Sequence, residues 1–383
     1  MSNTVLAPDG LPIGNRVWVD GCYDLAHYGH ANQIRQAKQF GKYLIVGVHS
    51  DEEIIKNKGP ILFEEEERYR LVASLKWVDE IVRDAPYCTT VETLDKYNCD
   101  FCVHGDDITL TADGKDTYGA VKAAKRYREC KRTTGVSTTD MVGRILLMTK
   151  AHHVSNESME QHSERTLSLS TDGQTQSPWT RVSQFIPTTQ AIFEFAEGKP
   201  PKPSDRIVYC CGSFDLFNIG HLSFLEEAAK LGDYLIVGIL SDQDINKYKG
   251  SNYPIMALHE RVLNVLAHRP VNEVIIGAPP IITEDFIRRF NISVVAEGTR
   301  SHDNADVFPD QFDDPIRLGI YTEVESHSDV TTETIINRII KNRLSYEQRN
   351  NRKEKKELAA FNALQKLKSC GQSGTLNTID ITN

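Results

Sequence analysis

Residues 21–30 have the sequence GCYDLAHYGH, and residues 212–221 repeat it as GSFDLFNIGH. One constant offset carries residues 21–59 onto 212–250 without a gap, and later matches include GVSTTDMVGRI against DVTTETIINRI. Agreement over such a length indicates a duplicated module. A chain of 383 residues also exceeds what one hydrophobic core usually organises, so we expect two domains.

Each copy begins with an apolar run, RVWVDG or RIVYCCG, and continues after a helical pattern with a second run, YLIVGV or YLIVGI. Alternating strand and helix patterns are typical of a parallel sheet covered by helices. We therefore predict an α/β fold with two tandem Rossmann-like domains. In such sheets ligands bind beyond the carboxyl ends of the strands, which is where GCYDLAHYGH lies.

Composition shifts divide the chain into five segments. These are an N-terminal tail (1–15), the first domain (16–150), a linker (151–205), the second domain (206–342) and a charged C-terminal helix and tail (343–383). Residues 155–178 of the linker are polar and Ser/Thr-rich, so they cannot bury enough apolar surface to order themselves. Residues 181–198 regain apolar residues at helical spacing and are expected to pack on a domain.

Composition and charge favour a cytoplasmic protein that binds small molecules. The net charge of -9 and a pI near 5.8 argue against a nucleic-acid binder. No stretch approaches the ~20 apolar residues of a membrane span, and the start MSNTVLAPDG lacks the pattern of a signal peptide. The eight cysteines are expected to be reduced thiols, with Cys99 and Cys102 in the core rather than at a zinc site.

The histidines of HYGH fall between a strand and a helix, where backbone N–H groups and the helix dipole favour a phosphate. His27 and His30 can converge on one phosphoryl group if the helix begins between them, and Gly29 lets the backbone approach a ligand closely. Two further stretches fit anions, because Lys58 stands in KNKG and Arg132 stands just before the helix start signal STTD. Three such clusters in one module fit a triphosphate better than a set of ordinary helix caps.

A second group of residues is expected at the same edge of the sheet. HGDD ends the apolar run FCVHG, which makes Asp106 and Asp107 ligand candidates. His104, Asp106 and Tyr87 could receive a substrate ammonium group, because a cation favours a carboxylate or an aromatic face. Loop solvation and turn capping explain each of these residues nearly as well. Asp24 is either a turn cap or a support for the pocket.

Together, HYGH, KNKG and RTTGVSTTD resemble the cytidylyltransferases of the nucleotidyltransferase superfamily, over nearly all of residues 16–345. The resemblance implies transfer of CMP from CTP to phosphoethanolamine for phosphatidylethanolamine synthesis, with CDP-ethanolamine and pyrophosphate as products and Mg²⁺ assisting. It also implies that His27 and His30 contact the phosphates at the reacting centre and that Lys58 bridges substrate and nucleotide.

The same resemblance implies that Arg132, with Ser137 and Thr138, holds the departing pyrophosphate. No metal ligand is identified in this way. The residues expected to bind CTP are Gly21, Cys22, Tyr23, Asp24, Gly29, Asp106, Val136, Ser137, Thr138 and Thr139.

The second copy departs from this pattern at two positions. Asn218 replaces the first histidine, and ESHSDVTTET has no arginine where KRTTGVSTTD has Arg132. Asparagine can donate a neutral hydrogen bond but cannot become cationic, so we expect catalysis in the first module. The second module keeps the residues of a candidate nucleotide pocket, which are Gly212, Ser213, Phe214, Asn218, Gly220, His221, Lys249, Thr331 and Thr332.

Three alternatives stay open. A cytidylyltransferase for choline phosphate or glycerol phosphate would share every phosphate-handling motif, although the choline-phosphate enzymes carry one catalytic module and a long amphipathic membrane segment. An aminoacyl-tRNA synthetase fragment would carry a similar histidine motif, but the acidic charge and the lack of a tRNA-binding domain argue against it. A non-catalytic sensor would bind CTP without consuming it. A homodimer and a peripheral membrane contact are also compatible with the sequence.

Overall fold

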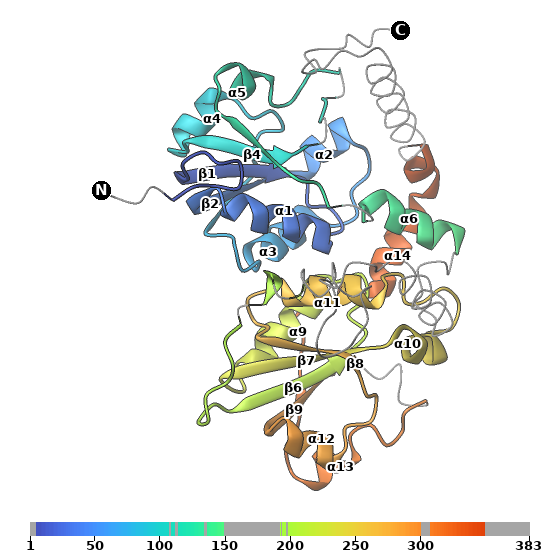
Figure 1. Cartoon of the computed structure of the whole chain (residues 1–383). Coiled ribbons are helices and arrows are strands. Elements are labelled where there is room, and N and C mark those ends of the chain that lie inside the picture. The colour runs from blue at the N-terminus through green and yellow to red at the C-terminus, as the bar shows by residue number, and fades with distance from the viewer. Residues whose placement is uncertain are drawn as a thin grey trace, which may run out of the picture.

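Each copy of the repeat forms a five-stranded sheet in which all paired strands run parallel. The order in the first sheet is β3 (Glu80–Arg83), β2 (Gly41–Val48), β1 (Gly14–Gly21), β4 (Phe101–Gly105) and β5 (Tyr127–Cys130). The order in the second sheet is β8 (Glu273–Ala278), β7 (Tyr234–Leu240), β6 (Ile207–Gly212), β9 (Ile292–Gly298) and β10 (Tyr321–Val324). The predicted α/β fold with two tandem Rossmann-like domains is confirmed (Figure 1).

The computed structural model describes residues 5–106, 109–111, 114–133, 136–148, 192, 194–196, 198–299 and 307–348. Helices of the first module are α1 (Tyr28–Lys38), α2 (Asp51–Asn57), α3 (Glu65–Ala73), α4 (Val91–Lys96), α5 (Gly119–Ala123) and α6 (Thr138–Leu147). Those of the second are α9 (Ile219–Ala229), α10 (Asp242–Lys249), α11 (Leu258–Leu266), α12 (Glu284–Arg289), α13 (Asp313–Arg317) and α14 (Thr332–Lys341). The polar part of the predicted linker, 155–178, lies outside the described residues.

The central strands carry continuous apolar runs because helices cover both faces of each sheet. In β1, Val17 and Val19 are buried in the cluster that extends under α1 and α3. Trp18 points to the opposite face and packs in a cluster that includes Leu94 of α4 and Val121 of α5. Strands buried on both faces therefore explain the continuous apolar runs in the sequence.

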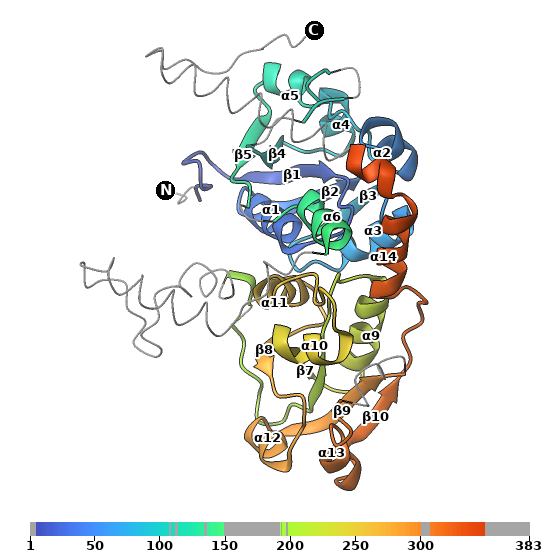
Figure 2. The same cartoon turned by 90° about the vertical axis from the view of Figure 1, so that its right-hand side faces the viewer.

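The inner helices of the two modules pack against each other in a pseudo-twofold arrangement. Helix α1 packs on α11, its counterpart α9 packs on α3, and α6 packs on α14 (Figure 2). Near the axis, Lys76 N donates a hydrogen bond to Ala267 O (3.0 Å), and Arg269 N donates one to Ser74 O (2.8 Å). One hydrophobic cluster runs through both modules, so the two sheets share a continuous core.

Part of the predicted linker packs on the first module. The ring of Phe195 lies edge-on against Trp77 (5.0 Å between centroids), and Glu194 forms an ion pair with Arg35 (2.6 Å). The prediction that residues 181–198 pack on a domain is therefore confirmed for their described part.

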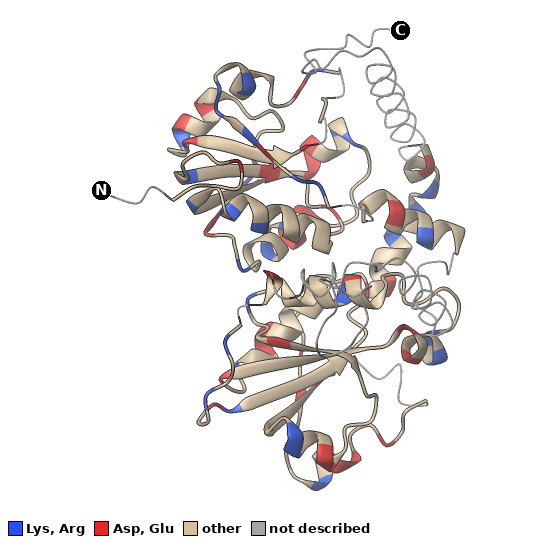
Figure 3. Cartoon of the chain, in the orientation of Figure 1, with Lys and Arg blue, Asp and Glu red and all other residues tan. Residues whose placement is uncertain are grey.

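The remaining surface and core agree with the composition. The seven described cysteines are free thiols, and Cys99 and Cys102 are buried as predicted. Acidic and basic residues are both spread over the two modules (Figure 3). In the part of the chain that the structure describes, no helix is long and apolar enough to cross a membrane.

Candidate active site

A cavity of about 210 Å³ opens at the carboxyl ends of β1 and β4. The chain leaves β1 towards β2 and β3 and later returns to β4 on the other side of β1, so the cavity lies at a topological switch point, where such sheets bind ligands. Most residues singled out in the sequence line it, namely Gly21, Cys22, Tyr23, Asp24, His27, Gly29, His30, Lys58, Tyr87, His104, Arg132, Val136, Ser137, Thr138 and Thr139. Asp106 is not among the lining residues, and Asp107 lies outside the described residues.

The two histidines of HYGH stack at the start of α1. Their ring centroids are 3.9 Å apart, with 24° between the ring planes. His27 is the N-cap, and its Nδ1 accepts a hydrogen bond from Gly29 N (3.1 Å), while Nδ1 of His30 accepts one from His27 N (3.4 Å). Because both Nδ1 atoms accept, the proton of each neutral ring is inferred to lie on Nε2. The helix begins at Tyr28, between the two histidines, so the condition for their convergence on one phosphoryl group is met.

Asp24 connects several segments of the cavity wall through hydrogen bonds. Its side chain is buried, and its Oδ1 accepts hydrogen bonds from Leu62 N (3.1 Å) and Phe63 N (2.8 Å). Its carbonyl oxygen accepts another from Thr138 Oγ1 (3.1 Å). Of the two roles left open by the sequence, the support role therefore fits Asp24, because it ties three segments of the pocket together.

A buried arginine that the motifs did not reveal completes this support. Arg68 donates hydrogen bonds to the carbonyl oxygens of Cys22 (2.9 Å) and His49 (2.6 Å), and it forms an ion pair with Asp51 (2.8 Å). Its counterpart Arg261 makes the same kind of contacts in the second module. The repeated ER pair, at 67–68 and 260–261, was the sequence signal that could have indicated it.

The candidate phosphate side is formed by two loops and the start of α6. Ser137 is the N-cap of α6, and its Oγ accepts a hydrogen bond from Asp140 N (3.1 Å), as the helix start signal predicted. Arg132 and Lys58 are exposed side chains that line the cavity. Asp106 accepts a hydrogen bond from Arg132 N (3.0 Å), so it shapes the loop that presents this arginine.

The cavity lining also contains polar residues that the sequence motifs missed. Asp20 is buried at the end of β1, and its carboxylate accepts hydrogen bonds from Tyr118 (2.6 Å) and Thr89. Burial lowers the pKa of His49, whose ring lies beside that of Tyr87 (5.1 Å between centroids). Tyr87 is one of the residues that the sequence suggested for a substrate ammonium group. The buried Tyr87 hydroxyl has no hydrogen-bond partner among the described residues. These side chains add a carboxylate, an imidazole and a phenol to the cavity lining.

The described residues contain no group of three or more His, Cys, Asp or Glu that could hold a metal ion. The two buried carboxylates of the cavity, those of Asp20 and Asp24, are engaged by hydroxyl and backbone N–H donors. These residues do not form a preformed metal site. An Mg²⁺ ion would have to take most of its oxygen ligands from nucleotide phosphates and water.

The second module has a corresponding cavity of about 180 Å³. Its lining includes Gly212, Ser213, Phe214, Gly220, His221, Lys249, Thr331 and Thr332. Asn218 instead caps α9, because its Oδ1 accepts hydrogen bonds from Gly220 N (2.9 Å) and its Nδ2 donates to Leu216 O (3.2 Å). It is not among the lining residues.

The second cavity carries less positive charge than the first. Glu333, which stands where the first module has Thr139, forms an ion pair with Lys249 (3.1 Å). Burial and the charge of Lys249 lower the pKa of His221 to about 4, so its imidazole, like the neutral rings of His27 and His30, adds no positive charge at pH 7. With Ser326 in place of Arg132, the electrostatics favour the first cavity for a polyanion.

Comparison with known proteins agrees with the division of the chain into two modules. Residues 18–144 and 209–337 both match the family described as cytidylyltransferase-like. The chain is 54% identical over 373 residues to the ethanolamine-phosphate cytidylyltransferase of Mus musculus, covering 91% of each chain. It is 52% identical over 347 residues to that of Dictyostelium discoideum, covering 90% of this chain and 95% of the relative.

A choline-phosphate relative matches only part of the chain. Choline-phosphate cytidylyltransferase 2 of Arabidopsis thaliana is 44% identical over 137 residues, which covers 34% of this chain and 44% of the relative. Only the ethanolamine-phosphate relatives among these three match over about 90% of the chain. The chain therefore belongs to the cytidylyltransferase-like family and, within it, to the ethanolamine-phosphate cytidylyltransferases.

Proposed function

We propose that the first cavity transfers CMP from CTP to phosphoethanolamine. A phosphate oxygen of phosphoethanolamine attacks the α-phosphorus of CTP, the bond from that phosphorus to the oxygen bridging to the β-phosphate breaks, and pyrophosphate leaves with the bonding electrons. The products are CDP-ethanolamine and pyrophosphate. The proposal is supported by the similarity to ethanolamine-phosphate cytidylyltransferases over about 90% of the chain and, above all, by the stacked His27 and His30 at the switch point.

The residues of the cavity act mainly by positioning and by charge stabilisation. A phosphomonoester is already nucleophilic, so the reaction needs no general base. His27 and His30 donate from Nε2 to the reacting phosphate, where negative charge develops in the transition state. Lys58 bridges the two substrates, and Arg132, with the start of α6, holds the departing pyrophosphate. CTP binding by the other lining residues, and by Asp106, belongs to the same proposal.

We place the acceptor end at polar lining residues that stand outside the phosphate-binding motifs. The ammonium of phosphoethanolamine would lie near the buried Asp20 carboxylate, with Tyr87 and His104 beside it. Such a cation is stabilised by a carboxylate and by aromatic faces. This arrangement supports an amino-alcohol acceptor rather than glycerol phosphate, which has no cation for Asp20 to receive.

Purified protein should consume CTP with phosphoethanolamine and Mg²⁺ and should prefer it to phosphocholine and glycerol phosphate. Pyrophosphate release measured with each acceptor checks this result, and nucleotide with no acceptor is the control. Equal or faster turnover of phosphocholine would move the assignment to that acceptor. Binding of CTP without any turnover would instead support a sensor.

Asp20→Asn should raise KM for phosphoethanolamine by about tenfold or more, because a hydrogen bond to a charged group is worth ~1.5 to 3 kcal/mol. The KM for CTP should change much less, since Asp20 lies at the acceptor end. Steady-state kinetics with each substrate varied in turn separates the two constants. A parallel rise in both KM values would place Asp20 outside the acceptor site.

Several finer features stay predictions. These are the nucleotide pocket of the second module, the role of Mg²⁺, the exact domain boundaries, a cytoplasmic location, a homodimer and a peripheral membrane contact. The charge balance of the second cavity makes the first the better candidate for CTP. Counting bound CTP per chain by equilibrium dialysis tests whether the second pocket is also filled.

A further inference from the structure

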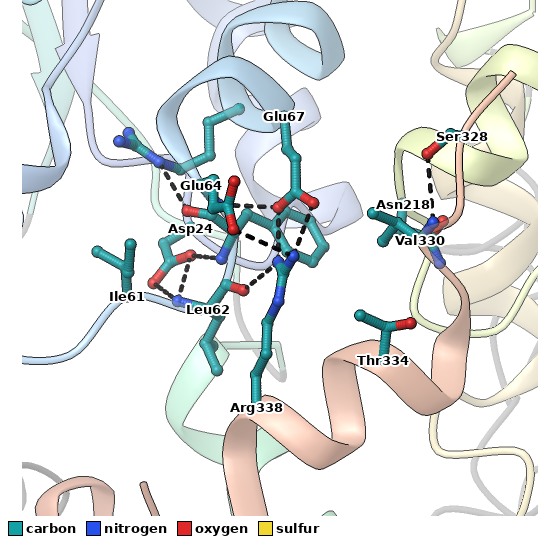
Figure 4. A network of polar contacts seen from close by, with 12 residues as sticks. Asp24, Ile61, Leu62, Glu64, Glu67, Asn218, Ser328, Val330, Thr334 and Arg338 are labelled. Atoms are coloured by element: carbon teal, nitrogen blue, oxygen red, sulfur yellow. Dashed lines mark hydrogen bonds and ion pairs between the residues drawn. The ribbon is translucent and has the colours of Figure 1, made fainter. Parts of the chain in front are cut away.

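Helix α14 connects the second cavity with the first module. It begins at the second cavity, where Thr332 Oγ1 donates a hydrogen bond to the Asp215 carbonyl (2.8 Å) and Glu333 pairs with Lys249 (3.1 Å). Farther along the helix, Arg338 reaches across to the first module (Figure 4). Residues of the second module therefore hold the start of α14, and its other half contacts the first module.

Arg338 makes a bidentate contact in the first module. Its Nη1 donates hydrogen bonds to Leu62 O (2.9 Å) and Glu67 Oε2 (2.7 Å), and its Nη2 donates one to Glu67 Oε1 (3.0 Å). Glu67 also accepts a hydrogen bond from Glu64 N (2.8 Å), which caps α3. A planar guanidinium that meets a carboxylate through two donors fixes orientation as well as distance.

Leu62 links Arg338 directly with Asp24 of the first cavity. The Leu62 carbonyl accepts from Arg338, while its N–H donates to the Asp24 carboxylate (3.1 Å) (Figure 4). The preceding carbonyl, that of Ile61, accepts a hydrogen bond from the hydroxyl of the buried Tyr346 (2.7 Å). Two consecutive carbonyls of the 58–64 loop, which joins α2 to α3, are thus held by residues from the C-terminal side of the chain.

We infer that Arg338 is a positioning residue for the first cavity. It holds the 58–64 loop, which starts with the cavity residue Lys58 and supplies the backbone donors for Asp24. The inference rests on the proposed function for its catalytic consequence, but the loop contact itself does not. Through this contact the second module completes the first active site, and it can do so without binding nucleotide.

Arg144 on α6 provides a matched control on the other side of the pseudo-twofold axis. Its Nη1 donates to Ile255 O (3.0 Å) and Glu260 Oε2 (2.7 Å), and its Nη2 donates to Glu260 Oε1 (3.0 Å). The N–H of Ile255 donates to the Asp215 carboxylate (2.7 Å), as Leu62 does to Asp24. Removing either arginine therefore deletes equivalent contacts between modules. Arg144→Ala also deletes the ion pair with Asp140 in the first turn of α6 (2.6 Å), but only Arg338 holds the 58–64 loop of the first cavity.

The test compares Arg338→Ala, Arg338→Lys and Arg144→Ala in the full chain. Arg338→Ala should lower kcat/KM for CTP about tenfold, and Arg144→Ala should lower it less than about threefold at a similar loss in Tm. Arg338→Lys keeps the charge but not the bidentate contact, so it should recover part of the activity. Deuterium exchange should rise in the peptide containing residues 61–64 in Arg338→Ala, and in the peptide containing 255–257 in Arg144→Ala.

Equal losses of kcat/KM in the two alanine variants, or unchanged exchange of residues 61–64 in Arg338→Ala, would overturn the inference. If the unaltered protein does not turn over CTP with phosphoethanolamine, the proposed function fails, while the exchange measurement still decides the loop contact. Should Arg338→Ala not fold, the milder pair Glu67→Gln and Glu260→Gln provides the same comparison, because these carboxylates receive the two arginines.

Discussion

His30→Ala should abolish CTP turnover, whereas His221→Ala should leave measurable activity. His30 stacks on His27 in the first cavity, and the two imidazoles together can place two donors on the reacting phosphate. Removing a preorganised donor to a developing charge costs roughly a hundredfold to a thousandfold in rate. Loss of the ring should also release His27, because the stacked arrangement of the pair would no longer exist.

His221→Ala is a suitable control because the local structures correspond. Nδ1 of His221 accepts a hydrogen bond from Asn218 N (3.3 Å), as Nδ1 of His30 accepts one from His27 N (3.4 Å). Both alanine variants lose this cap contact, so their Tm values should fall by similar amounts. The second cavity has no partner imidazole at position 218, and the low pKa of His221 keeps its ring neutral at pH 7.

Measured kcat with saturating CTP and phosphoethanolamine decides between the two cavities. Some loss of kcat in His221→Ala is expected, because one hydrophobic core runs through both modules and a change in the second can disturb the packing of the first. A reversed pattern, with activity kept in His30→Ala and lost in His221→Ala, would make the second cavity the active site. Asn218 would then have to support the reaction from its position as an N-cap.

The fold could be predicted from the sequence because each signal it depends on is local. Apolar runs such as YLIVG mark strands that are buried on both faces, and the repeat shows that the same order of elements occurs twice. The start of α6 after Ser137 follows from cap chemistry within a few residues. The residues that line the phosphate side of the first cavity stand in these local motifs.

The proposed acceptor end was only partly predictable because the fold assembles its residues from separate strands and loops. Asp20 ends a strand whose apolar pattern predicts burial and gives no sign of a binding role. Its hydroxyl partner Tyr118 comes from nearly a hundred residues later in the chain. His49 stands in no motif. The contact of Arg338 with Leu62 depends on how the two modules dock, and no local pattern records that geometry. Comparison of equivalent positions, Arg144 and Arg338, was the remaining signal.

Lys58→Ala and Arg132→Ala should each lower kcat/KM for CTP by roughly tenfold to over a hundredfold. In the proposed reaction, each change removes a charged hydrogen bond to phosphate, worth ~1.5 to 3 kcal/mol. The side chains of both residues are exposed at the rim of the cavity, so their loss should leave Tm nearly unchanged. The lower kcat/KM should therefore reflect weaker binding or slower reaction of CTP and not a less stable fold.

Two controls separate phosphate contacts from general charge effects. Lys249→Ala removes the residue that corresponds to Lys58 from the second cavity, where no reaction is proposed, so turnover should fall much less. Arg132→Lys keeps one positive charge while losing the guanidinium fork, so it should restore only part of the activity if Arg132 holds pyrophosphate through two donors.

Pyrophosphate inhibition gives an independent measurement, because weaker product binding should raise its inhibition constant in Arg132→Ala. Full activity in both alanine variants of the first cavity, with normal folding, would show that the phosphates bind elsewhere, and the reaction would then have to be placed away from the start of α6.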